Sequence, residues 1–254
     1  MKIAMHSDLH IEGYRLLYNT LSDTGYDVLV LAGDIVSAKT IDRLQVLREK
    51  VPTDKPVIFV PGNHEFYGGC IKQTANELRD KCSELGFIYA DRKVVVIDEV
   101  VFICATGWAT LDSFHEYSME EKWLAMKSCI ADFQAIKSNS VDDMIERGKA
   151  DYEFIKSNLE LYKDHKCVVV THFSPSETYG NQNFDVTPIS SYFSNDWTHL
   201  MYEYQPVFWV YGHTHGSVEG RIYRTRVVTN QRGYGHECFA TYNENKIIEV
   251  NLNE

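Results

Sequence analysis

Five stretches of the sequence place metal-ligand residue types directly after a short apolar run. Carboxylates and imidazoles gathered in one site suit Mn, Fe, Zn, Co or Ni better than Ca or Mg alone. Two such ions held close together can clamp a phosphoryl group and activate water. In chain order the stretches contain Asp8 and His10, Gly33 and Asp34, Gly62-Asn63-His64-Glu65, His172, and His213 and His215.

Each stretch also has an ordinary structural explanation when it is taken alone. Asp8-x-His10 fits a loop that caps a helix, Gly33-Asp34 fits a simple turn, and His172 fits a hydrogen-bonded core histidine. Their joint occurrence favours a shared site, because ligands of open α/β sheets gather outside the carboxyl ends of the strands. We therefore predict that five strand ends converge on one metal centre.

The apolar runs themselves predict the elements that position these residues. A helix is expected around Tyr14, Leu17 and Leu21, and two more over residues 41–47 and 71–85. Strands that first alternate with helices and then follow one another predict an α/β sandwich with mixed sheets. The expected strands cover residues 2–5, 27–32, 57–60, 94–97, 101–104, 166–171, 207–211, 226–229, 238–242 and 246–251.

Residues 112–165 interrupt this pattern with two helical stripes. Ser118 and Glu121 have the spacing of a capping box, and Ser140 opens the second stripe. We expect an antiparallel helical hairpin that either packs on the body or covers the site, within a single domain over residues 1–254. The stripes are Met119, Trp123, Met126, Ile130 and Phe133, then Val141, Ile145, Gly148, Tyr152, Ile155, Leu159 and Tyr162.

Composition restricts the partners. The formal net charge of −11 disfavours non-specific nucleic-acid binding. Residues 220–235, however, hold four arginines and no acid. These arginines either form a phosphate-binding patch or lie on the outer face of a β-hairpin. No apolar run approaches the roughly 20 residues of a membrane helix. The six cysteines are scattered, with no Cys-x-x-Cys pair, and no signal peptide is evident, so we expect a cytoplasmic protein.

Taken in order, the five stretches resemble the calcineurin-like metallophosphoesterases over about residues 5–215. The resemblance implies a four-layer α/β/β/α sandwich with two mixed β-sheets plus a helical insert. Within the superfamily the chain resembles a bacterial and phage branch that has no established substrate. The branch motifs are Thr171-His172-x-x-Pro175-Ser176, Ala131-Asp132-Phe133 and Asn230-Gln231-Arg232-Gly233-Tyr234.

The resemblance also implies the roles of the site residues. One divalent ion would be held by Asp8, His10 and His215, the other by Asn63, His172 and His213, and Asp34 would bridge the two. A hydroxide shared by the ions would attack phosphorus, and His64 would assist the leaving oxygen, unless it only orders its loop. Many relatives carry an acid three residues after the bridging aspartate, which pairs with this histidine, but here that position is Ser37.

We predict a dinuclear metal-dependent phosphoesterase that acts on a monoester or diester of a small or nucleotide-like molecule. Asn63, Asn230 and Arg232 are candidate substrate-binding residues, the last because a guanidinium binds phosphate as a fork. One alternative is a DNA or RNA nuclease of the same superfamily. A second is a non-catalytic, metal-stabilised binding protein. The sequence does not choose the metal, the substrate or the oligomeric state.

Overall fold

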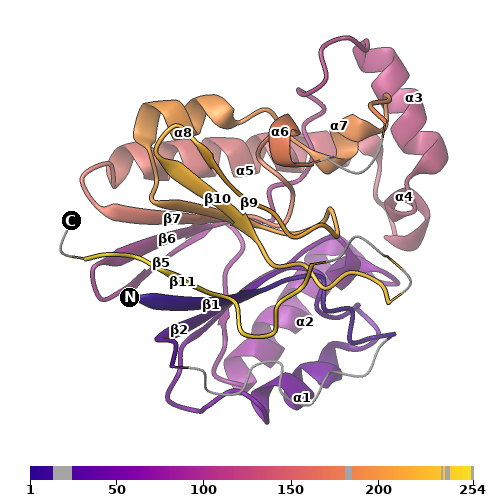
Figure 1. Cartoon of the computed structure of the whole chain (residues 1–254). Coiled ribbons are helices and arrows are strands. Elements are labelled where there is room, and N and C mark those ends of the chain that lie inside the picture. The colour runs from indigo at the N-terminus through magenta and orange to yellow at the C-terminus, as the bar shows by residue number, and fades with distance from the viewer. Residues whose placement is uncertain (14–24, 181–184, 236, 238–240, 253–254) are drawn as a thin grey trace.

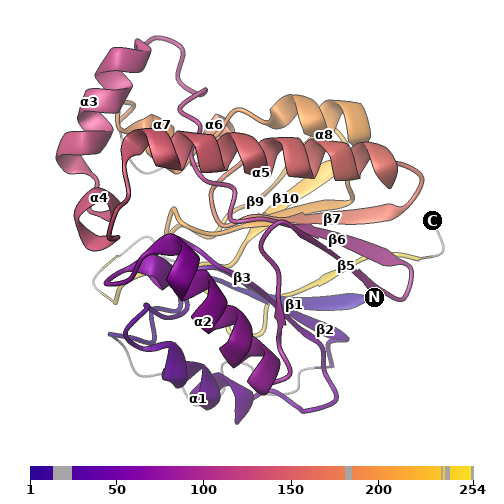
Figure 2. The ribbon, with the colours of Figure 1, turned by 180° about the vertical axis from the view of Figure 1, so that it is seen from behind.

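The computed structural model describes residues 1–13, 25–180, 185–235, 237 and 241–252. Over these residues two sheets pack face to face, with helices on the outer face of each (Figure 1). Seen from behind, α2 (Ile71–Glu84) lies outside one sheet and α5 (Val141–Leu161) outside the other (Figure 2). This is the predicted four-layer sandwich. The helix expected around Tyr14, Leu17 and Leu21 lies outside the described residues, as does most of the strand expected over 238–242.

The first sheet has five strands in the order β11-β1-β2-β3-β4. Strands β1 to β4 run parallel, and β11 pairs antiparallel with β1, so the sheet is mixed. The strands are β1 (Lys2–His6), β2 (Val28–Ala32), β3 (Val57–Val60), β4 (Ile88–Tyr89) and β11 (Ile247–Glu249). Its outer face is covered by α2, α1 (Leu44–Arg48) and the 3-10 turn η1 (Ile41–Arg43), and η2 (His64–Phe66) follows β3.

The second sheet has six strands in the order β5-β6-β7-β8-β10-β9. The antiparallel pairs lie at its two edges, and the three central pairings are parallel. The strands are β5 (Lys93–Ile97), β6 (Val100–Cys104), β7 (Lys166–Val170), β8 (Phe208–Tyr211), β9 (Glu219–Ile222) and β10 (Thr225–Thr229). Outside it lie α5 and α8 (Thr198–Tyr204), and the connections contain α6 (Glu177–Gly180) and α7 (Ser190–Phe193).

The core has apolar layers on both faces of each sheet. In β2, Val28 and Val30 belong to the layer between the two sheets, whereas Leu29 and Leu31 face the helices α1 and α2. Successive side chains of a strand point to opposite faces, so a strand covered on both faces is apolar at every position. Complete burial of each such side chain contributes about 1.5–3 kcal/mol. This explains the absence of polar alternation in these strands.

The insert differs from the expected hairpin. Ser118 caps α3 (Met119–Cys129) in a capping box with Glu121, as predicted. The expected single helix then breaks, because Ile130 is extended (φ −89°, ψ 125°) and the chain restarts as α4 (Asp132–Ala135). As a result, α3 crosses one end of α5 and does not run alongside it (Figures 1 and 2).

Helix α5 belongs to the outer layer of the second sheet, because Ile155 and Leu159 pack with the side chains of β6 and β7. The single domain and the insert over about residues 112–165 stay predictions. Within the described part of the chain, no helix has the length and apolar character needed to span a membrane.

Candidate active site

The seven predicted ligands lie together at the carboxyl ends of β1, β2, β3, β7 and β8, where the edges of both sheets meet. The His and Asp ligand atoms form two groups that share Asp34, and within each group they lie within 4.8 Å of one another. Asn63 joins the second group, since its Oδ1 lies 3.1 Å from His172 Nε2. The groups are Asp8, His10, Asp34 and His215, and Asp34, His172 and His213.

Five of the seven have a left-handed backbone, with φ between 43° and 75°. Non-glycine residues seldom adopt this conformation, and it concentrates at functional sites. Glycines make room between these loops. A Cβ on Gly62 would collide with Asp34 and His172, and one on Gly212 would lie 2.7 Å from Asp8 Oδ2. The left-handed ligands are Asp8, His10, Asp34, His213 and His215.

The centre contains polar atoms that lack the partners expected in a protein interior. His213 Nε2 and Asp8 Oδ2 are buried without a hydrogen bond, an arrangement that is costly unless a ligand satisfies it. Two imidazole nitrogens, His10 Nε2 and His215 Nε2, lie 3.1 Å apart. Divalent cations at the two ligand groups would give all four atoms a partner, so the residues present fit divalent metal binding.

The pKa values of Asp34 and His213 agree with this, whereas for His172 burial lowers the pKa but Asp34 outweighs burial and raises it to about 9. Burial raises the pKa of the Asp34 carboxyl, but His172 and His64 outweigh burial and hold the pKa well below its usual value. Burial holds the pKa of the His213 imidazole well below its usual value, with a smaller contribution from His172. Asp34 is therefore a carboxylate and His213 a neutral imidazole, the forms that ligate metals.

A second layer of acceptors orients the ligands. His10 Nδ1 lies 3.0 Å from Glu12, and His215 Nδ1 lies 2.7 Å from Glu237. His172 Nδ1 lies 2.9 Å from the Ala32 carbonyl oxygen. Such acceptors receive a hydrogen bond from Nδ1–H and thereby orient the Nε2 lone pair toward the ion. We did not predict these residues from the sequence, and only the position of Glu12, two residues after His10, offered a signal.

Glu65 holds two of the ligand loops together. Its carboxylate is buried and accepts four backbone N–H groups, with oxygen-to-nitrogen distances of 2.6–3.0 Å. Three of these belong to residues 34–36 and the fourth to Gly62, so Glu65 fixes the loop of Asp34 beside the loop of Asn63. The sequence analysis quoted Glu65 within a motif but gave it no role.

His64 lies beside the centre, with Nε2 3.9 Å from Asp34 Oδ2 and 3.2 Å from the Tyr234 hydroxyl. The lack of an acid at Ser37 left its partner in question, and the structure places Glu12 Oε1 3.6 Å from His64 Nδ1. Burial lowers the pKa of His64, but Asp34 and Glu12 outweigh burial and raise it to about 9. In the metal-free protein His64 is therefore an imidazolium at neutral pH, able to donate a proton.

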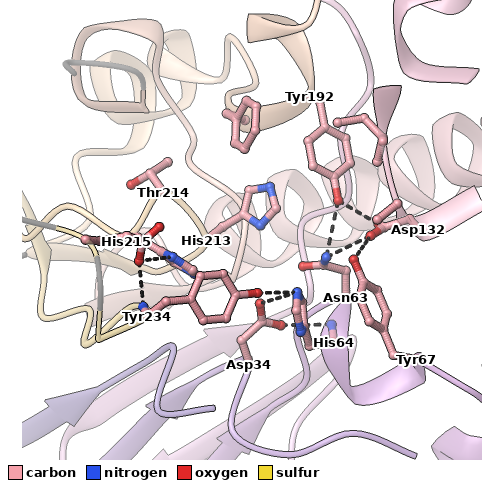
Figure 3. A pocket seen from close by; sticks show the side chains of 14 residues that line it. Asp34, Asn63, His64, Tyr67, Asp132, Tyr192, His213, Thr214, His215 and Tyr234 are labelled. Atoms are coloured by element: carbon pink, nitrogen blue, oxygen red, sulfur yellow. Dashed lines mark hydrogen bonds and ion pairs between the residues drawn. The ribbon is translucent and has the colours of Figure 1, made fainter. Parts of the chain in front are cut away.

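A pocket of about 280 Å³ opens over the centre. Asp34, Asn63 and His64 line its floor, and aromatic side chains form much of its wall (Figure 3). The Tyr67 ring stacks on the His64 ring at a centroid distance of 4.1 Å. The insert reaches the pocket through Ile130, Ala131 and Asp132, and the remaining lining residues are Tyr192, Phe193, His213, Thr214, His215, Tyr234 and Glu237.

Two predicted substrate-binding residues do not line this pocket. The Asn230 side chain is buried and donates to the carbonyl oxygens of Met5 and Asn243. The Arg232 guanidinium donates to the Leu9 carbonyl oxygen at 3.1 Å. Both side chains are held by the backbone beside the Asp8 loop, so a role in substrate binding is not supported. Asn63 does line the pocket.

The arginine-rich segment forms the edge hairpin β9-β10, the plainer of its two interpretations. Arg226 pairs with Glu219, which also lies 2.6 Å from Lys246 Nζ. Arg221 donates to the Arg224 carbonyl oxygen within the turn. An acid just outside the segment therefore offsets part of its positive charge.

Comparison with known proteins relates this geometry to a family. The family model described as calcineurin-like phosphoesterase matches residues 1–217. An uncharacterised protein, L509, of Acanthamoeba polyphaga mimivirus is 26% identical and aligns over 91% of this chain and 90% of its own length.

Solved structures share the fold. The phosphopantetheinyl hydrolase PptH of Mycobacterium tuberculosis superposes with a TM-score of 0.74 at 20% identity, covering 92% of this chain and 89% of its own. A putative 5′-nucleotidase of Staphylococcus aureus superposes with a TM-score of 0.50 at 16% identity, covering 92% of this chain and 49% of its own. At these identities the superpositions establish the fold alone.

Proposed function

The chain belongs to the calcineurin-like phosphoesterase family, and we propose that it hydrolyses a phosphate monoester or diester of a small or nucleotide-like molecule with two divalent ions. The predicted resemblance and enzyme class, a metal-dependent phosphoesterase, are confirmed by this membership. The substrate, the number of ions and the site roles are our proposals.

The main support for this proposal is the Asp34 carboxylate, which belongs to both ligand groups. Its Oδ1 lies 3.3 Å from His172 Nε2 and its Oδ2 lies 4.0 Å from His10 Nε2, so its two oxygens face different ligand groups. We assign Asp8, His10 and His215 to one ion, Asn63, His172 and His213 to the other, and Asp34 to both. When bound, a pair of divalent ions such as Mn, Fe, Zn, Co or Ni supplies charge neutralisation at the phosphoryl group and lowers the pKa of water.

The residues of the chain supply the remaining chemistry. His64 lies on the pocket floor, where it would protonate the leaving oxygen, and Glu12 and Tyr234 hold its ring. Proton transfer by a positioned side chain contributes roughly 10²–10⁴-fold to the rate. The aromatic wall offers flat apolar contacts to the group that leaves.

The pocket volume favours a compact substrate. About 280 Å³ lies near the lower end of the range for small-molecule sites. The net charge of −11 disfavours a long polyanion, and the Arg226–Glu219 pair weakens the case for the arginine segment as a nucleic-acid face. A nuclease would lose activity steeply between low and moderate salt, so the salt dependence of hydrolysis separates the two classes.

A substrate panel tests the proposal. The metal-free protein is reconstituted with Mn²⁺ and given a phosphomonoester, a phosphodiester, cyclic nucleotides, dinucleoside polyphosphates, and single- and double-stranded DNA. We expect hydrolysis of at least one small ester, lost on chelation and in Asp34→Asn. Asp142→Asn is the matched control, because Asp142 is exposed on α5 and belongs to neither ligand group. No hydrolysis of any substrate would favour the non-catalytic binding protein.

Two further proposals concern the whole chain. The five cysteines in the described part of the chain are all free thiols, which supports a reducing, cytoplasmic compartment. The alignment of 90% of the viral relative with 91% of this chain supports a single domain over residues 1–254.

A further inference from the structure

Asn63 differs from the other six proposed ligands, because its amide has one end that binds a cation and one that repels it. Rotation of the amide exchanges Oδ1, an acceptor, with Nδ2, which carries two donor hydrogens. A site that uses asparagine therefore needs a neighbour that makes the two orientations unequal in energy.

The neighbour is Asp132. Asn63 Nδ2 lies 2.9 Å from Asp132 Oδ1 and 3.2 Å from the Tyr192 hydroxyl (Figure 3). Asn63 Oδ1 lies 3.1 Å from His172 Nε2. A rotated amide would place its oxygen against a carboxylate oxygen at that distance. Because an ionised carboxylate only accepts hydrogen bonds, this orientation would replace an attractive contact with a repulsive one.

Asp132 is built as an acceptor. It is fully buried, and the hydroxyls of Tyr67 and Tyr192 each donate to it at 2.6 Å. Among the described residues no salt bridge includes it. Three donors from two segments, Asn63 and Tyr67 at the ends of η2 and Tyr192 in α7, thus converge on one carboxylate. They satisfy it without a cation, in agreement with the rule that buried charges need full hydrogen bonding.

The backbone explains how a residue of the insert reaches this position. The break at Ile130 ends α3 and directs the chain inward, so that Asp132 opens α4. Two backbone hydrogen bonds of 2.8 Å, Gly68 N to Ala135 O and Lys137 N to Gly69 O, then attach α4 to the segment that follows η2. Asp132 and Asn63 are therefore held on segments that are joined to each other.

We propose that Asp132 is a positioning residue of the metal centre, which orients the Asn63 amide so that its oxygen faces the ion of the Asn63, His172 and His213 group. The insert then has a defined role, since it completes one of the two metal sites. The inference rests on the metal centre of the proposed function but not on hydrolysis.

Metal binding tests the inference directly. The metal-free full chain and its variants are titrated with Mn²⁺, and calorimetry and electron paramagnetic resonance report the number of ions and their coupling. Asp132→Leu keeps the approximate shape but removes the acceptor, and should weaken the second ion by roughly tenfold to a hundredfold. Asp132→Asn keeps one acceptor oxygen and should bind the second ion within about threefold of wild type, because that oxygen can still face Asn63 Nδ2. Asp142→Asn is the control and should match the wild type.

A second background separates orientation from general support of the fold. In Asn63→Asp both side-chain oxygens are ligands, so no orientation is needed and Asp132 becomes a repelling neighbour. Asp132→Asn should therefore strengthen Mn²⁺ binding in that background, although it does not in the wild type. This comparison uses only conservative variants and applies even where Asp132→Leu fails to fold.

Three outcomes overturn the inference. The first is a folded Asp132→Leu protein that binds two ions as tightly as wild type, and the second is Asp132→Asn with the same effect in both backgrounds. A wild-type protein that binds only one ion overturns it as well. Hydrolysis of the panel is measured in parallel. Two coupled ions that depend on Asp132, with no hydrolysis, would uphold the inference and reject the proposed function, whereas hydrolysis with metal binding independent of Asp132 would do the reverse.

Discussion

The substitution Glu65→Gln replaces one carboxylate oxygen of a buried side chain with an NH₂ group, and it should strongly destabilise the fold. Oε1 of Glu65 accepts the N–H groups of Ile35 and Val36, and Oε2 accepts those of Asp34 and Gly62. Glutamine has one oxygen and one NH₂ group. In either orientation its oxygen keeps two of the four donors, and its NH₂ group faces the other two.

The expected magnitude follows from these contacts. Each buried donor left without an acceptor costs about 1–3 kcal/mol. Two such donors give a loss of about 2–6 kcal/mol, before any repulsion between the facing N–H groups is added. Domains are stable by only about 5–15 kcal/mol, so this one substitution should remove a large part of the folding free energy. Either choice of oxygen also loosens a loop that carries a proposed ligand.

Urea titration of the metal-free protein measures this effect, with no contribution from bound ions. Glu77→Gln is the matched control, because Glu77 is exposed on α2 and accepts a side-chain hydrogen bond from Gln73, at 2.8 Å. The control should lie within about 0.5 kcal/mol of wild type. A Glu65→Gln protein within about 1 kcal/mol of wild type would refute the reasoning, since the lower bound for two orphaned donors is about 2 kcal/mol.

Three further predictions concern catalysis, pH and metal binding. Glu12→Gln should slow hydrolysis of an ester with a poor alkyl leaving group by about tenfold or more, because His64 loses its carboxylate partner. Hydrolysis of a p-nitrophenyl ester, whose leaving group needs no proton, should slow much less. Equal losses for the two esters would contradict this role. Burial, with a smaller contribution from the charge of Asp91, raises the pKa of Asp151 to about 8. The folded state thus keeps a proton that the unfolded state releases above its pKa of about 4, so stability should fall as the pH rises from about 5 to 8. Urea titrations at both pH values should show a smaller fall in Asp151→Asn, and an unchanged fall would count against the assignment. Mn²⁺ at about 100 times its Kd should raise the unfolding free energy by about 2.7 kcal/mol per site, and thermal unfolding unaffected by Mn²⁺ would contradict a built metal site.

The sequence predicts which residues gather at this centre, because one physical rule links position to chemistry. A strand buried on both faces is apolar throughout, so the first polar residues after it mark the carboxyl end of the strand. Asp8, Asp34 and His172 each follow such a strand, and the structure places them together. Both sheets follow from the same apolar runs, whereas the two-residue strand β4 and the edge strand β9 lack a full run and were not predicted.

The second layer could not be predicted in the same way. Glu12 and Glu237 are ordinary acidic residues in the sequence, and Asp132 stands in a motif that gave it no role. Only tertiary packing decides which of many acids lies behind a ligand. The helical periodicity of residues 119–133 gave a wrong prediction, a single helix, for a related reason. Ile130 keeps the spacing of one long helix, but its backbone is extended, and the restart at α4 buries Asp132 against two tyrosines. Tertiary hydrogen bonds there outweigh a local preference worth less than about 1 kcal/mol per residue.

Several features of this centre each reduce the stability of the folded chain. Five proposed ligands hold left-handed backbones, at a cost of about 1–3 kcal/mol each. Two polar atoms are buried without partners, and two imidazole nitrogens lie 3.1 Å apart. Stability alone does not explain these residues, because other residue types would avoid the costs. A surface cleft alone does not explain them either, because it would not require their burial. Divalent cations at the two groups would give the unpartnered atoms and the imidazole nitrogens a partner, and their binding free energy would offset the backbone cost. The centre is therefore best understood as a scaffold that Glu65 and the second layer of acceptors hold ready. Because the folding free energy already carries these costs, ion binding should stabilise the whole domain.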